Sequence, residues 1–262
     1  MSTDIAPGVW LTERCPKTRA VGMVSAVLSG LAGLVDLALP SGCASCAAEG
    51  PVLCRVCAGA LADPAYLTRP DPTPDGLPPT WAVAAYAGAV RAAVVAHKEE
   101  GRRALARPLG AALARGVLAA WCGPSSSVGS RSSLLLVPAP SRGAAVRARG
   151  ADPTLALARS AAARLRGEGL DVQVVRALRV GMGMLDQAGL GAADRAANLA
   201  GALRVSRSAA GRVAGSCVMV VDDVVTTGAT LAEAARALRA AGAEVSAAAV
   251  VAATRRTGRT GR

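Results

Sequence analysis

The feature that most restricts the fold of this chain is an apolar run that leads into two adjacent carboxylates, a small-residue loop and a helix. Residues 218–221 are all apolar, which is typical of a strand covered on both faces, and Asp222 and Asp223 end the run. The loop at 226–230 combines threonines with a glycine, and the apolar residues after it recur at helical spacing: Leu231, Ala234, Ala235, Leu238 and Ala241. We therefore predict an α/β fold in which a buried strand, a loop and a helix that begins near Thr230 follow one another.

The residue types in this stretch suit a sugar phosphate. Unpaired N–H groups at a helix N-terminus carry about half a positive charge and attract phosphate. Gly228 permits backbone conformations that other residues rarely adopt, and threonine hydroxyls add donors. Asp222 and Asp223, at the carboxyl end of a strand, would accept hydrogen bonds from two ribose hydroxyls or approach a hydrated Mg²⁺. The alternative is an ordinary core strand and a capped helix, with Thr230 as the N-cap and Glu233 completing a capping box.

This stretch resembles the 5-phosphoribosyl-1-diphosphate (PRPP) loop of type I phosphoribosyltransferases. The resemblance implies a parallel sheet flanked by helices, with Asp222 and Asp223 in contact with the ribose of the ligand. It also implies a cradle for the 5′-phosphate made of Thr226, Thr227, Gly228, Ala229 and Thr230.

Four cysteines form two close pairs nearer the N-terminus, Cys43 with Cys46 and Cys54 with Cys57. Each CxxC pair can present two thiolates from one turn, and two pairs supply tetrahedral S₄ coordination, which suits Zn²⁺. Four protein ligands leave no open position, so we predict a structural zinc site in a small zinc-ribbon-like module. Two disulfides, four free thiols or a redox CxxC are the alternatives.

Basic residues follow a second apolar run, at 134–137, and suggest a second anion site. Ser141, Arg142 and Arg149 belong to the loop between this predicted strand and a helix that begins near Thr154. Arginine forks match phosphate geometry, so we predict that this loop contacts the diphosphate of the ligand, and Lys98 is a further candidate for that contact. The alternatives are a solvated arginine-rich loop and, for Lys98, a solvated charged turn.

The rest of the chain divides by composition. A run of prolines predicts a stiff linker, and the apolar run 21–35 ends at Asp36, so it is too short to span a membrane and suits an amphipathic packing helix better than a signal peptide or anchor. The predicted divisions are a tail (1–20), a helix with the four-cysteine module (21–66), a proline-rich linker (67–80), a phosphoribosyltransferase-like domain (81–253) and a basic tail (254–262). Further strands are predicted at 81–86, 172–175 and 245–251, and helices at 90–96 and 105–121.

The charge balance of the chain is strongly basic. The net charge is +12, and only Lys17 and Lys98 are lysines, so arginine supplies most of the positive charge. Nucleic acid or phosphate ligands would explain this balance, and a compositional bias toward alanine, glycine and arginine would explain it equally well. Phenylalanine is absent and other aromatic residues are few. The core must therefore consist of alanine, valine and leucine, and a stacking platform for single strands is disfavoured.

In their order along the chain these motifs resemble the ComF family of competence-associated, phosphoribosyltransferase-like proteins. The resemblance covers roughly residues 31–253 and rests on the cysteine module, 86–88, 98–101, 137–140, 149–150, 221–230 and the polar residues Gln187, Arg195 and Asn198. It implies a bacterial, cytoplasmic protein with a role in DNA uptake. Gln187, Arg195 and Asn198 would belong to a lid over the site or to a surface helix. Residues 151–153 depart from the aromatic and polar residues that the family has at these positions.

Two functions from different classes follow from these patterns. The first is a phosphoribosyltransferase that binds PRPP with Mg²⁺ and transfers the sugar phosphate to an acceptor that the sequence does not identify. The second is a non-enzymatic adaptor whose zinc module and arginine-rich surfaces bind single-stranded DNA or a helicase-like partner. A redox role for the CxxC pairs ranks third. The patterns predict no membrane span and leave an oligomer open.

Overall fold

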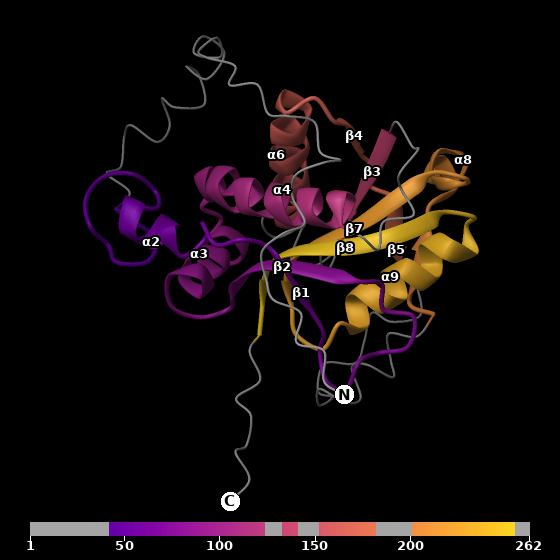
Figure 1. Cartoon of the computed structure of the whole chain (residues 1–262), viewed down its shortest axis with the longest axis horizontal. Helices are drawn as coiled ribbons and strands as arrows, with labels where there is room; N and C mark the ends of the chain where they lie inside the picture. Colours follow the sequence, from indigo (N-terminus) through magenta and orange to yellow (C-terminus); the bar gives the residue numbers. More distant parts are fainter. Residues whose placement is uncertain (1–41, 124–132, 141–151, 182–200, 255–262) are drawn as a thin grey trace, which may run out of the picture.

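A computed structural model describes residues 42–123, 133–140, 152–181 and 201–254 (Figure 1). Its centre is a six-stranded sheet of mostly parallel strands. In spatial order the strands are β1 (Tyr66–Thr68), β2 (Thr80–Ala85), β8 (Glu244–Ala253), β7 (Cys217–Val225), β3 (Ser133–Pro138) and β4 (Asp171–Val174). Only the edge strand β1 is antiparallel to its neighbour. The predicted α/β sheet flanked by helices is therefore confirmed.

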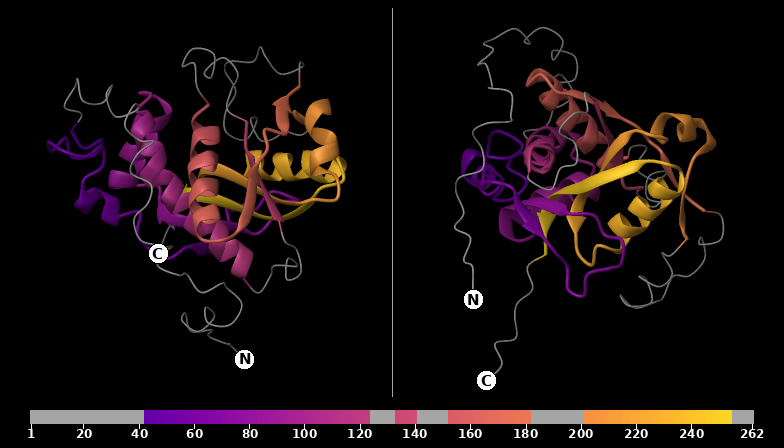
Figure 2. Two further views of the ribbon diagram at one scale, coloured as in Figure 1. Left: turned by 90° about the horizontal axis from the view of Figure 1, so that it is seen from above. Right: turned by 45° about the vertical axis from the view of Figure 1, so that its right-hand side comes forward.

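Helices cover both faces of the sheet because its central strands are apolar on both faces. On β7, Met219 and Val221 face one apolar cluster, whereas Val218 and Val220 face the other. The first cluster is covered by α3 (Gly88–Lys98), α4 (Ala106–Cys122) and α6 (Pro153–Gly167), and the second by α9 (Ala229–Ala240) and α8 (Arg207–Val213). Figure 2 shows the sheet between these two layers.

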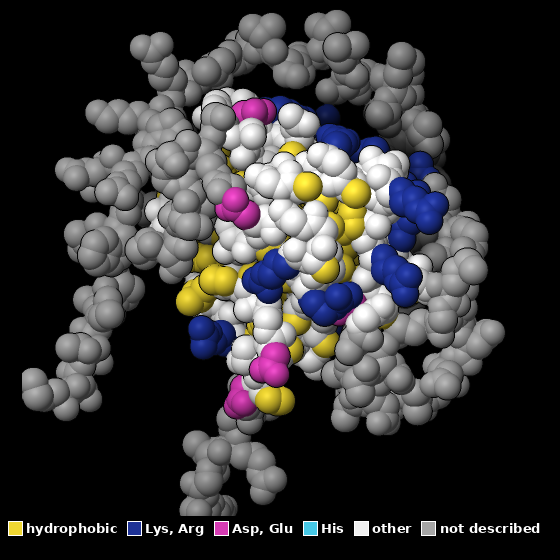
Figure 3. Space-filling view, turned by 90° about the vertical axis from the view of Figure 1, so that its right-hand side faces the viewer, with side chains coloured by type: hydrophobic (Ala, Val, Ile, Leu, Met, Phe, Trp, Pro, Cys, Tyr) yellow, Lys and Arg dark blue, Asp and Glu magenta, His cyan; other side chains and the backbone are white. Residues whose placement is uncertain are grey.

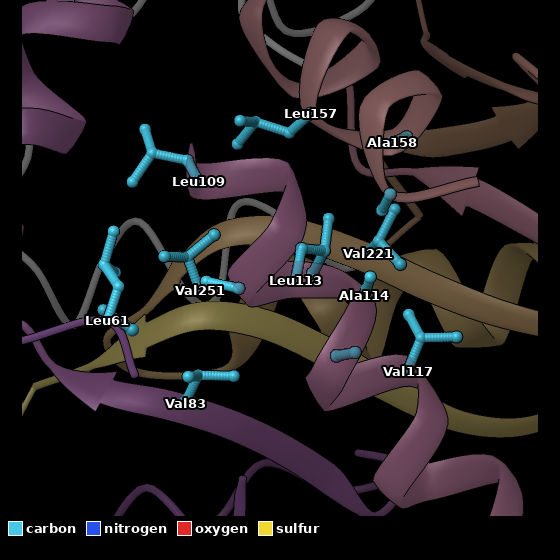
Figure 4. Packing of buried hydrophobic residues seen from close by; sticks show 14 of the residues in the cluster. Leu61, Val83, Leu109, Leu113, Ala114, Val117, Leu157, Ala158, Val221 and Val251 are labelled. Atoms are coloured by element: carbon cyan, nitrogen blue, oxygen red, sulfur yellow. The ribbon is translucent and has the colours of Figure 1, made fainter. Parts of the chain in front are cut away.

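Small residues allow this core to close without phenylalanine. A Cβ added to Gly110 of α4 would lie 2.4 Å from the Cβ of Ser160 on α6, so these two helices approach each other as closely as a glycine permits. Leu109 and Leu113 of α4 and Leu157 of α6 then fill the space above the sheet (Figure 4). The predicted core of alanine, valine and leucine is confirmed.

Three short strands and the region around them differ from the prediction. The predicted linker 67–80 begins inside β1 and ends in the first residue of β2. Between these strands the chain packs against the main domain: Arg239 Nη1 donates to the Gly76 carbonyl at 2.7 Å. A separate two-stranded antiparallel sheet, β5 (Leu178–Val180) with β6 (Leu203–Val205), was also not predicted.

The four-cysteine module packs on the same core. It contains a single short helix among its described residues, α2 (Arg55–Gly59), and α3 is joined to α4 by the 3₁₀ helix η1 (Arg103–Leu105). Cys43, Leu53 and Leu61 are buried in the apolar cluster that α3, α4 and α6 share. Figure 4 shows Leu61 directed toward the same space as Leu109 and Val251.

Several predictions concern residues outside the described ranges. These are the tail at 1–20, the helix at 21–35, the diphosphate contacts Ser141, Arg142 and Arg149, the polar set Gln187, Arg195 and Asn198, and the basic tail after residue 254. Within the described ranges, no helix has the length and apolar character needed to cross a membrane.

Candidate functional site

The topology of the sheet points to one edge as a candidate ligand site independently of any motif. From β3 the chain crosses through α6 to β4, and from the neighbouring strand β7 it crosses through α9 to β8, in the opposite direction along the sheet. Parallel sheets bind ligands outside the carboxyl ends of their strands, at the point where the direction of the crossovers reverses. That point lies between the carboxyl ends of β3 and β7.

The acidic pair lies at this point, inside β7 rather than beyond it. The prediction that the strand ends at residue 221 is wrong, because β8 continues to pair with β7 as far as Val225. The neighbour on the other side is shorter: Pro138 of β3 lies opposite Val221, and Ala139 N–H donates to the Val221 carbonyl at 2.8 Å. Among the described residues, 222–225 therefore have a strand on one side only, so the acidic pair extends past the carboxyl end of β3.

The two carboxylates accept hydrogen bonds from the backbone that follows each of them. Asp222 Oδ1 accepts from Asp223 N–H, and Asp223 Oδ1 accepts from Val224 N–H, each at 2.8 Å. Asp223 is buried and its second oxygen, Oδ2, lies 2.8 Å from Lys98 Nζ at the C-terminus of α3. Partial burial lowers the pKa of Lys98, but the carboxylates of Asp223, Asp222 and Glu99 together raise it overall. Lys98, one of the predicted site residues, is thus a charged partner of the acidic pair.

Asp222 holds its proton more tightly than an ordinary aspartate. Burial of its carboxyl group and the adjacent Asp223 carboxylate raise the pKa of Asp222 well above the usual value, against the opposing effect of Lys98. A cation or a set of hydroxyl donors at this point would relieve the repulsion between the two carboxylates.

The pH dependence of stability should report this shift. At pH values between the ordinary aspartate pKa of about 4 and the raised pKa of Asp222, this carboxyl group is more fully protonated in the folded protein than in the unfolded chain. The unfolding free energy should therefore fall as pH rises through this range. The Asp222→Asn variant should lose this part of the slope, whereas the exposed Asp171→Asn, at the other end of the sheet, should keep it. Urea denaturation at a series of pH values measures both slopes. Identical slopes for wild type and Asp222→Asn would contradict the assignment.

The predicted phosphate loop follows directly. Helix α9 begins at Ala229, one residue before the predicted start, and its N-cap is Gly228 with φ +76°. The first regular helical bond runs from Ala232 N–H to the Gly228 carbonyl, so the N–H groups of the first turn point out of the helix end. Thr227 Oγ1 accepts weakly from Ala229 N–H, at 3.4 Å. These groups face the same edge as the acidic pair.

The alternative of a capping box at this helix is wrong. Glu233 is buried, and its carboxylate accepts from Leu203 N–H at 2.9 Å and pairs with Arg236 at 2.6 Å. It therefore secures β6 to α9 and does not cap the helix. Glu233 therefore leaves the amides of the loop to other acceptors, of which Thr227 Oγ1 takes Ala229 N–H weakly.

Gly228 is the position at which this loop should be most sensitive to substitution. Its positive φ is unfavourable for any side chain, and an added Cβ would lie 3.1 Å from Pro70 Cγ and 3.2 Å from Leu77 Cδ2. We expect Gly228→Ala to lower the unfolding free energy by about 1–2 kcal/mol, measured by urea denaturation. Gly211→Ala is the matched control, because it lies in α8 with open space around it. An equal effect of both substitutions would refute the special role of Gly228.

A cavity of about 510 Å³ lies beside the loop. Its lining combines the carboxyl ends of β7 and β8 with β1 and the segment after it: Tyr66, Thr68, Arg69, Pro70, Asp71, Val225, Thr226, Ala253 and Thr254. The sequence contained no signal for this wall, since the proline-rich segment was interpreted as a linker. The structure thus adds a Tyr, an Arg and an Asp to the neighbourhood of the predicted phosphate loop.

The four cysteines form a second, separate site. Their Sγ atoms all lie within 4.8 Å of one another, and Cys46 Sγ and Cys54 Sγ are 3.8 Å apart. A tetrahedron with Zn–S bonds of about 2.3 Å has S–S edges of about 3.8 Å, so the four thiols are spaced to hold a zinc ion. The six cysteines that the structure describes are all free thiols. This excludes the alternative of two disulfides among Cys43, Cys46, Cys54 and Cys57.

Ionisation within the cluster also favours a cation. The backbone N–H groups of Cys46 and Cys54 donate to Cys43 and lower the pKa of its thiol to about 6. At Cys57 a hydrogen bond with Ser45 lowers the pKa, but burial and the other cysteines raise it to about 12. The Cys43 thiolate therefore forms readily, whereas positive charge between the sulfurs would help Cys57 to ionise.

The structure therefore brings together most of the predicted residues that it describes. Asp222, Asp223, Lys98 and the 226–230 loop share one edge of the sheet, and β3 delivers the chain to the same edge just before Ser141. His97, the only histidine in the chain, is buried and contacts the Arg102 and Pro153 carbonyls, so it has a structural environment.

Comparison with known proteins agrees with this geometry. The family described as "Phosphoribosyl transferase domain" matches residues 155–260, a segment that runs from α6 through the acidic pair and its loop to β8. No sequence among the curated proteins matches the chain. The matched segment starts after β2, α3 and β3, which the structure shows to be part of the same sheet and its cover. The chain therefore carries a phosphoribosyltransferase domain and, N-terminal to it, a four-cysteine cluster that could bind zinc.

Proposed function

We propose that this protein binds PRPP and transfers its phosphoribosyl group to an acceptor. The observation that carries the proposal is the acidic pair in β7, which lies beside the crossover reversal and leads directly into the loop at the N-terminus of α9. Asp222 and Asp223 would hold the ribose hydroxyls. Thr226, Thr227 and the amides of residues 228–230 would hold the 5′-phosphate.

In the proposed reaction the bond between ribose C1 and the diphosphate oxygen breaks, and diphosphate leaves with the electron pair. A bond forms between C1 and a nucleophilic atom of the acceptor, which loses its proton to solvent or to a base. Lys98 would place positive charge near the leaving group, together with Ser141, Arg142 and Arg149. Mg²⁺, bound with PRPP, would neutralise part of the diphosphate charge, and the oxygen ligands of Asp222 and Asp223 suit such a cation. The protein contributes mainly positioning.

For the cysteine cluster we propose a structural zinc ion held by Cys43, Cys46, Cys54 and Cys57. The sulfur spacing and the lowered pKa of Cys43 support it. A cytoplasmic location, in which thiols stay reduced, would keep these ligands available.

A second function, as an adaptor that binds DNA in uptake, is favoured by one specific observation. Residues 172–181 and 201–216 contain no acidic residue and carry several exposed arginines: Arg176, Arg179, Arg204, Arg207 and Arg212. Arg179 lies directly opposite Arg204 across the β5–β6 pair, an arrangement of like charges that disfavours pairing unless an anion binds. Figure 3 shows Lys and Arg side chains gathered along one border of the side that carries α8. ComF membership and a link to competence belong to this proposal.

Calorimetric titration of the purified zinc-loaded protein with PRPP and Mg²⁺ tests the first function. Saturable binding, followed by release of diphosphate with some member of a panel of bases, would support it. The adaptor function predicts instead salt-sensitive binding to single-stranded DNA that survives loss of the acidic pair. A folded protein that binds no PRPP would rule out the first function.

A further inference from the structure

One arginine contacts both the four-cysteine module and the segment that carries Lys98. The guanidinium of Arg102 donates from Nη2 to the Gly42 carbonyl at 2.6 Å. Its backbone N–H donates to the Ala96 carbonyl in the last turn of α3 at 3.1 Å, and its own carbonyl lies 3.4 Å from His97 Nδ1. Arg102 therefore closes the loop 99–102 against the end of α3 while its side chain reaches a different module.

The carbonyl that Arg102 contacts is held by the cysteine loop. Gly42 immediately precedes Cys43, and a Cβ added to it would lie 2.7 Å from the Ala47 carbonyl oxygen and 3.0 Å from that of Ala48. Cys43 N–H in turn donates to the Ala48 carbonyl at 2.8 Å. The position of the Gly42 carbonyl thus depends on the conformation of the loop that presents Cys43 and Cys46.

On the other side the same segment reaches the acidic pair. Lys98 is the last residue of α3 and lies 2.8 Å from Asp223. His97, its neighbour, also contacts the Pro153 carbonyl at 3.2 Å, at the start of α6. A shift of the 97–102 segment would therefore move Lys98 relative to Asp223 and would alter the contact with α6.

We propose that Arg102 is a positioning residue that couples metal occupancy of the cysteine cluster to the geometry of Lys98 and Asp223. With the metal bound, the cysteine loop is fixed, the Gly42 carbonyl is in place, and Arg102 holds the 97–102 segment so that Lys98 meets the acidic pair. Without the metal, Gly42 moves and the segment loosens. The inference deepens the proposed function and, for its effect on PRPP, rests on it.

Hydrogen exchange measured by mass spectrometry, with the full chain in zinc-loaded and chelator-stripped forms, tests the coupling directly. We expect the amides of 99–102 in wild type to exchange roughly tenfold faster after zinc is removed. In the Arg102→Ala variant the amides of 99–102 should exchange fast in both the zinc-loaded and the stripped form. The variant should still bind one zinc ion, because Arg102 contacts no sulfur ligand in the described structure. Arg103→Ala is the control, since this neighbour is exposed in η1 and should behave as wild type.

The same proteins are then titrated with PRPP and Mg²⁺. Zinc removal should weaken binding by wild type roughly tenfold and should have no further effect on Arg102→Ala, which starts from the weakened value. A general loss of folding would not produce this pattern of insensitivity.

Protected 99–102 amides in stripped wild type, or loss of zinc by Arg102→Ala, would overturn the proposal. PRPP binding unaffected by zinc or Arg102 would also overturn it while leaving the transferase function intact. A wild type that binds no PRPP would defeat the transferase function, and the exchange data alone would then decide the coupling.

Discussion

The double variant Asp222→Asn, Asp223→Asn is expected to bind PRPP with Mg²⁺ about 100-fold or more weakly than the wild-type protein. Each hydrogen bond from a ribose hydroxyl to a carboxylate contributes about 1.5–3 kcal/mol, and every 1.4 kcal/mol is a tenfold change in affinity. Asparagine keeps the shape of the side chain and one acceptor oxygen, so the loss reports the charge. Calorimetric titration at fixed pH and salt measures it.

The fold should survive this double substitution. Lys98 loses its partner, but its side chain is 39% exposed and can be hydrated where it stands. Asp171→Asn removes one negative charge at the amino end of β4, away from the site, and should bind PRPP as wild type does. If both proteins kept full affinity, Asp222 and Asp223 would have no role in ribose binding.

Loss of one zinc ligand is expected to have the largest effect on stability. Structural zinc sites of this kind contribute about 10–16 kcal/mol in isolated peptides, and part of that contribution should be lost in Cys43→Ser, so a decrease of several kcal/mol is expected. Cys43 is the most buried ligand, at 3% exposure, and belongs to the core cluster together with Leu53 and Leu61. The melting temperature should fall and the stoichiometric zinc, measured by elemental analysis, should disappear.

Cys122→Ser is the control that distinguishes the effect of losing the metal from the effect of removing a cysteine elsewhere in the chain. Cys122 is the last residue of α4 and is not a member of the cluster, so the variant should retain its zinc. A wild-type protein that is purified without metal and melts at the same temperature as Cys43→Ser would show that the cluster is a set of free thiols.

Local patterns were sufficient for the elements whose structure depends on near neighbours. The apolar run before Asp222, the glycine at the N-cap of α9 and the two CxxC pairs each specify a short-range structure. The protein has a strand, a helix start and a cluster of thiols at these places. The alternation of Val218, Met219 and Val220 between two apolar clusters follows from the same periodicity.

Patterns failed where a distant partner decides the outcome. Strand β7 continues past the acidic pair because β8 pairs with it, whereas β3 ends earlier, opposite Val221. Strand β1 overlaps the start of the predicted linker because β2 offers an edge, and proline composition does not reveal that edge. Strands β5 and β6 are too short to show a period, and the interaction that secures them comes from Glu233 on another element.

The sequence by itself determined the chemistry available at each site: adjacent carboxylates before a glycine-containing loop, and four thiols at metal-binding spacing. Only the tertiary structure decided which groups meet. Lys98 reaches Asp223, and Arg102 reaches Gly42, across long stretches of chain. The physical reason is that backbone periodicity acts over a few residues, whereas these contacts depend on how α3 packs over the sheet and against the cysteine module, which is fixed by burial of apolar surface from the whole chain.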